Sequence, residues 1–99
     1  MRVIAKRTLR EFWDQPGRSD AELPLRAWYA EAAKALWQTP ADIKARYRNA
    51  SFVAGNRVVF NIAGNKYRLI VRIRYDIRVV FIRFVGTHQE YDRIDVGSV

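Results

Sequence analysis

The chain has 99 residues, of which 49% are hydrophobic, so we expect one compact domain over residues 1–99 with its own core. No cysteine is present, which excludes disulfides and thiol chemistry, and no apolar run suits a membrane span or a signal peptide, so we expect a cytoplasmic protein without membrane contact. The net charge of +8 favours a polyanionic partner, with nucleic acid preferred to a membrane surface because no strongly amphipathic basic helix accompanies the charge.

The first 21 residues predict an edge strand and a short helix. Residues 1–5 (MRVIA) are short and β-branched, as in an edge strand. Apolar residues at helical spacing predict a helix over residues 6–14, which ends before Pro16 and Gly17. Ser19 or Asp20 is expected to cap a second helix.

The second helix is predicted from an apolar stripe at intervals of three or four residues. The stripe comprises Leu25, Trp28, Ala32 and Leu36 and continues to Trp37. Thr39-Pro40 then predicts the start of a short helix over residues 41–46, and residues 49–51 read as a loop. The three Trp of this half are expected to anchor the core rather than to stack on bases.

Three antiparallel strands are predicted between residues 57 and 87, because turn signals at Gly64-Asn65 and Asp76-Ile77 define a register. In that register Phe60 lies opposite Leu69, which lies opposite Phe84, and these partners share an apolar face. Val58, Val71 and Ile82 line up in the same way on that face.

The opposite face of these strands is expected to be basic, because side chains alternate along a strand. It collects Arg57, Asn61, Lys66, Arg68, Arg72, Arg74 and Arg83. The predicted architecture is therefore α+β: an edge strand, two helices, a short helix, three antiparallel strands and a polar tail, with the helices on the apolar face and the basic face left open.

Arg83 interrupts VVFIRFV, which otherwise reads as a buried strand. A buried guanidinium needs a partner, and two explanations stay open. One is an ion pair with Glu90 or Asp92; the other places Arg83 beside Arg68 as a clamp on phosphate.

His88 is the only histidine and follows the last strand directly, with Tyr91 three residues later. A histidine at the end of a basic sheet can act as general base or acid on RNA, and Tyr91 can stack on a base or share the proton transfer. A solvated surface histidine is the competing explanation. A metal site built on His88 with Glu90, Asp92 and Asp95 is not expected, because one imidazole with loosely spaced carboxylates is a weak ligand set.

Three stretches of the chain together resemble a known family: TPADIKARY (39–47), FNIAGNKYRLIV (60–71) and FIRFVGTHQEYDRID (81–95). Their GN-x-YR and GTH-x-EYD patterns are similar to those of the HigB family of type II toxin–antitoxin systems, within the RelE/ParE superfamily. The resemblance implies a RelE/ParE-like fold and an mRNA interferase that cuts messenger RNA, typically on translating ribosomes. It also implies a HigA-like helix-turn-helix antitoxin partner, with DNA contacted only through that complex. On size and charge we expect the free protein to be a monomer.

The resemblance further implies cleavage without a metal or cofactor, by attack of a 2′-hydroxyl on the adjacent phosphorus to leave a cyclic phosphate and a 5′-hydroxyl. The catalytic set expected here is Arg68 and Arg83 for the phosphorane charge, His88 as base or acid, and Tyr91 as its assistant. Positioning of RNA is expected from Arg57, Asn61, Asn65, Lys66, Arg72 and Arg74, and Lys66 could exchange roles with His88.

Two other functions remain open on the sequence alone. ParE-type toxins of the same superfamily act on DNA gyrase and do not cut RNA. A non-catalytic RNA-binding module would use the basic face for phosphates and Tyr67 or Tyr75 for stacking, although the register points both tyrosines into the core.

Overall fold

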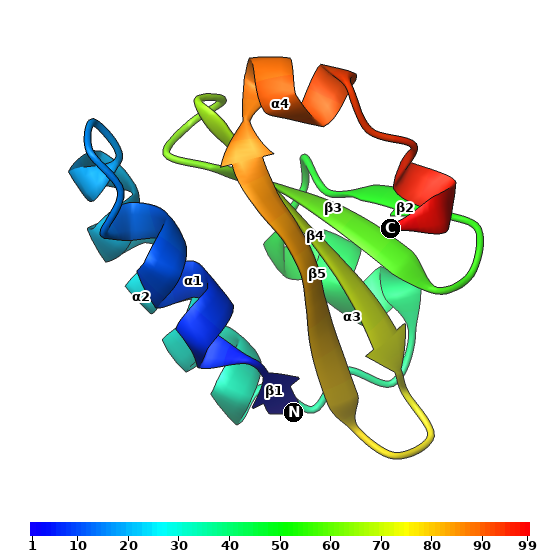
Figure 1. Cartoon of the computed structure of the whole chain (residues 1–99). Coiled ribbons are helices and arrows are strands. Elements are labelled where there is room, and N and C mark those ends of the chain that lie inside the picture. The colour runs from blue at the N-terminus through cyan, green and yellow to red at the C-terminus, as the bar shows by residue number, and fades with distance from the viewer.

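The structure, a computed structural model, describes residues 1–99 as an α+β fold (Figure 1). Its helices are α1 (Lys6–Trp13), α2 (Glu22–Lys34), α3 (Pro40–Arg46) and α4 (His88–Asp92), with 3₁₀ turns η1 (Ser19–Ala21) and η2 (Val96–Ser98). The strands are β1 (Arg2–Ile4), β2 (Ser51–Val53), β3 (Arg57–Ile62), β4 (Tyr67–Arg74) and β5 (Val79–Thr87). They form one sheet in the order β1-β5-β4-β3-β2, parallel between β1 and β5 and antiparallel elsewhere. No helix has the length and apolar character needed to cross a membrane.

The core lies between the N-terminal helices and one face of the sheet. Trp28 of α2 meets the ring of Phe60 edge-on at 5.4 Å, and Phe12 of α1 meets Tyr67 at 5.3 Å. Trp13, Trp28 and Trp37 are all buried, so the prediction that the tryptophans anchor the core is confirmed. Tyr67 is buried as well, and Tyr75 is half-buried against the same core, as the predicted register required.

The predicted pairing of the central strands is confirmed over most of its length. Phe60 lies opposite Leu69, and Val71 lies between Val58 on one side and Ile82 on the other. Both turn positions hold, because β3 ends and β4 begins around Gly64-Asn65, and β4 ends and β5 begins around Asp76-Ile77. Over β3 and β4 the predicted apolar and basic sets therefore separate onto two faces.

One part of the predicted register is wrong. Leu69 lies opposite Val85 rather than Phe84. The cause is a β-bulge: Arg83 is an extra residue in β5 without a partner in β4. A bulge of this kind redirects the side chain at its position and increases the local twist.

The side chain of Arg83 is consequently exposed, and the expectation of a buried guanidinium is wrong. Neither predicted acidic partner pairs with it. Glu90 forms its ion pair with Arg18, and Asp92 lies beside His88.

Three features of the first half also differ from the predictions. The second helix ends at Lys34, and Leu36 is 71% exposed, because the backbone at Ala35 becomes extended (ψ 153°). Neither predicted cap bonds to α2: Asp20 lies in η1, where its carboxylate binds other groups. Ser51, predicted to be loop, begins β2, a three-residue strand too short to show a period-two pattern.

The basic face is not left entirely open. Val59 and Ile70 point away from the helices yet are 3% and 0% exposed. Arg57, on the same face, donates from Nε to the carbonyl of Val99 at 3.0 Å. The chain after α4 therefore lies over the β3 side of this face, as the path of the red segment in Figure 1 also indicates.

Candidate active site

The N-terminus of α4 is held in place by contacts among Thr87, Glu90 and Arg18. Thr87 and Glu90 form a capping box: Thr87 N donates to Glu90 Oε1 at 2.8 Å, and Glu90 N donates to Thr87 Oγ1 at 3.2 Å. The same carboxylate binds Arg18 at 3.0 Å. The hydrogen bond from the Thr87 backbone and then the Arg18 guanidinium lower the pKa of Glu90, which keeps the carboxylate ionised and the cap in place.

This arrangement sets the position of His88, the first residue of α4. Its Nε2 lies 2.9 Å from Nη2 of Arg68, which projects from the neighbouring strand β4. A guanidinium can only donate, so this contact is a hydrogen bond when Nε2 accepts, which is the role of Nε2 in the tautomer that carries its proton on Nδ1. That Nδ1 lies 3.5 Å from Oδ2 of Asp92, one helical turn further on.

Tyr91 completes the group. Its ring lies 5.5 Å from Cζ of Arg68 and meets the His88 ring edge-on at 6.5 Å. Arg68 is half-buried, and its Nε is buried without a hydrogen-bond partner. A buried guanidinium N–H without an acceptor costs free energy. The terminal Nη2, which contacts His88, is the kind of donor that suits an anionic oxygen.

Arg83 belongs to a second group on the same face. It lines a shallow pocket of about 260 Å³ with Arg72, Arg74 and Phe81. Arg74 is bound by Asp76 at 2.8 Å, whereas Arg72 and Arg83 have no acidic partner. Arg68, His88 and Tyr91 do not line this pocket, so the predicted catalytic four fall into two groups.

The remaining predicted RNA-binding residues differ in whether their polar groups are already paired within the protein. Lys66 forms an ion pair with Asp20, which also accepts from the hydroxyl of Tyr67, and this pairing raises the pKa of Lys66. Asn65 is exposed in the β3–β4 turn. Asn61 is half-buried, lies opposite Arg68, and makes no side-chain hydrogen bond.

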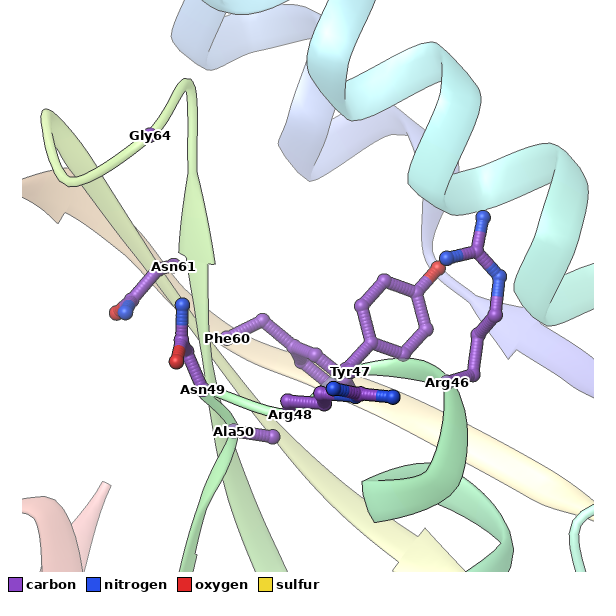
Figure 2. Close-up of a pocket in the computed structure, with 8 residues that line it drawn as sticks. All are labelled: Arg46, Tyr47, Arg48, Asn49, Ala50, Phe60, Asn61 and Gly64. Atoms are coloured by element: carbon purple, nitrogen blue, oxygen red, sulfur yellow. The ribbon is translucent and has the colours of Figure 1, made fainter.

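Several residues at these sites were not selected from the sequence as functional. The sequence suggested Asp92 as a partner of Arg83 or as a weak metal ligand and not as a partner of His88, although its i+4 spacing from His88 is a signal for contact on one helical face. Arg18 is remote in sequence and gave no signal. A second pocket, of about 290 Å³, is lined by Arg48 and Asn49 together with Asn61 (Figure 2).

Comparison with known proteins identifies the family of the chain. Residues 21–94 match the family model of the HigB toxin, described as the RelE-like toxic component of a toxin–antitoxin system. The chain is 27% identical over 95 residues to the mRNA interferase toxin HigB of Escherichia coli strain K12, a match that covers 93% of this chain and 88% of the relative. The mRNA interferase HigB proteins of Escherichia coli O157:H7 and Shigella flexneri match with the same identity and coverage.

Proposed function

Because the chain belongs to the HigB family of RelE-like toxins, the toxic components of toxin–antitoxin systems, we propose that it is an mRNA interferase that cleaves messenger RNA. The observation that carries this proposal is the contact of 2.9 Å between Arg68 and Nε2 of His88. It joins a permanent cation, suited to phosphate, to an imidazole nitrogen that can accept a proton. The resemblance to HigB relatives named as mRNA interferases supports RNA as the substrate.

In the proposed reaction, the scissile phosphate binds Arg68, whose Nη2 then donates to a phosphate oxygen instead of to His88. The freed Nε2 of His88 accepts the proton of the 2′-hydroxyl as the 2′-oxygen bonds to phosphorus. The bond from phosphorus to the 5′-oxygen breaks, and that oxygen takes a proton from the Tyr91 hydroxyl or from water, which leaves a 2′,3′-cyclic phosphate and a 5′-hydroxyl. Solvent then returns a proton to that donor and accepts the proton from His88.

The groups around His88 and Arg68 stabilise the charges that develop during the proposed reaction. Asp92 stabilises the imidazolium that forms when His88 takes the proton. Arg68 stabilises the phosphorane, an effect commonly worth about 3 kcal/mol for a preorganised donor. The ring of Tyr91 can stack on a base, and its hydroxyl can pass a proton to the leaving oxygen.

The pocket-lining Arg72 and Arg83 lie along the same face and would hold backbone phosphates on one side of the cut. Cleavage is proposed to occur on translating ribosomes, and a HigA-like helix-turn-helix antitoxin is proposed to silence the toxin. The membership of a toxin–antitoxin family supports the existence of such a partner.

The test is brief expression in cells followed by mapping of new 5′ ends on translated messages. Wild type should produce new ends with a 5′-hydroxyl, and Arg68→Ala and His88→Ala should reduce them by about 100-fold or more. Arg10→Ala, a change to an exposed arginine of α1, is the matched control and should cut normally. Growth arrest without new ends in wild type would instead indicate a target other than RNA, such as gyrase.

A further inference from the structure

The pocket in Figure 2 lies at an edge of β3 that its neighbouring strand leaves uncovered. β2 pairs only with the first three residues of β3, up to the pair Ser51 and Val59. Asn61 therefore lies beyond the end of β2, and the loop that follows α3 brings Asn49 and Arg48 to the same space. The result is a polar hollow of about 290 Å³ outside the group around His88.

The polar groups of this pocket fall into two sets. Arg46 forms an ion pair with Glu31, which also accepts from the hydroxyl of Tyr47 at 2.7 Å. The polar groups on this side of the pocket are therefore already paired with one another. Figure 2 shows the Tyr47 hydroxyl directed away from the amides of Asn49 and Asn61. By contrast, the side chains of Asn49 and Asn61 make no hydrogen bond in the protein, and Arg48 has no acidic partner.

The pocket adjoins the proposed cleavage site. Asn61 of β3 is the direct cross-strand partner of Arg68 of β4, and the two side chains share a face. Directly opposite residues in an antiparallel pair have Cβ atoms about 5 Å apart. A nucleotide next to the phosphate on Arg68 would thus lie within reach of the Asn61 amide.

We infer that this pocket holds the base of the nucleotide next to the cleaved bond, and that Asn49 and Asn61 read its edge. This inference rests on the proposed function. A carboxamide presents one donor and one acceptor in a plane, which matches the paired donor and acceptor on a base edge and discriminates between bases.

The chemistry of the pocket favours a base over a phosphate. Its two unpaired amides are uncharged, and the charge of Arg46 is already neutralised by Glu31. The pocket around Arg72 and Arg83 has the opposite character, with unpaired guanidinium groups that suit phosphates. Arg48, at the rim, is assigned to the backbone phosphate that enters with the base.

The experiment compares the bases that flank the mapped cuts for five proteins. These are wild type, Asn49→Ala, Asn61→Asp, Arg48→Ala and the matched amide control Gln38→Ala, whose residue is exposed outside the pocket. Asn61→Asp keeps the shape but replaces the amide donor with an acceptor. Binding of each protein to short single-stranded RNAs that differ in one base provides a second readout that does not require cleavage.

The two asparagine variants should change the ratio of cutting between preferred and disfavoured bases by about fivefold or more at one flanking position. Arg48→Ala should weaken cutting and binding equally for all bases, and Gln38→Ala should match wild type. Cuts in wild type with the same flanking preference in both asparagine variants would overturn this inference and leave the proposed function intact. No cuts in wild type would overturn the proposed function itself.

Discussion

Arg18 and Glu90 form an ion pair of 3.0 Å that ties the segment before η1 to the first turn of α4. Through the capping box with Thr87, this contact reaches the residue directly before His88. Glu90→Gln keeps an acceptor for Thr87 but loses the ion pair, so we expect a lower kcat for message cleavage, an unchanged KM and a loss of stability below about 1 kcal/mol.

Thr87→Ala removes the cap and should cost about 1 kcal/mol together with a larger fall in kcat. Thr39→Ala is the matched control, since Thr39 forms the same kind of capping box at α3. It should lower stability by a similar amount, as measured by urea unfolding, and leave kcat as in wild type. Equal loss of kcat in both variants would show that α4 has no special positioning role.

The lowered pKa of Glu90 predicts a pH dependence of stability. Because the folded protein lowers the pKa from its ordinary value of 4.5, chiefly through the Thr87 backbone, Glu90 stabilises the fold above that value. This contribution is lost as pH falls through the lowered pKa in the folded state. The difference in unfolding free energy between wild type and Glu90→Gln should be constant above about pH 6 and shrink below pH 4.5. A difference that does not change with pH would contradict the prediction.

Replacing Arg83 distinguishes a catalytic role from a role in binding phosphates of the RNA backbone. The sequence predicted a catalytic clamp beside Arg68, whereas the structure groups Arg83 with Arg72 and Arg74. We expect Arg83→Ala to raise KM, to leave kcat within a few-fold, and to reduce the salt dependence of RNA binding by about 0.7 in log–log slope. Arg72→Ala should behave in the same way. Loss of kcat in Arg83→Ala alone would restore the catalytic role.

Gly86 is required by the packing of Phe84. A Cβ at Gly86 would lie 2.5 Å from Cζ of Phe84 and 3.2 Å from Cβ of Glu90. We expect Gly86→Ala to cost about 1–3 kcal/mol, because the Phe84 ring must move. Adding Phe84→Leu should recover part of that loss in urea unfolding, and a double variant with strictly additive losses would show that the contact is not the cause.

Much of the fold follows from local pattern. Period-two alternation and the Gly64-Asn65 turn are sufficient to pair Phe60 with Leu69, and Thr39-Pro40 is sufficient to place the start of α3. These features depend on neighbours in the sequence, so the chain predicts them without a tertiary context. The same alternation by itself separates the basic residues of β4 from the apolar ones.

The bulge at Arg83 could not be predicted from alternation along the strand. Only the pairing of β5 with β4 shows that one residue of β5 has no partner. The end of α2 at Lys34 is a similar case: Leu36 continues the helical spacing, but the chain must turn there for Trp37 to reach the core. Arg18 meets Glu90, and Asn49 meets Asn61, only when segments distant in the sequence come together. Residue types and spacing thus predicted a basic sheet face that ends at one histidine, and the three-dimensional packing determined which of the basic side chains lie beside the imidazole.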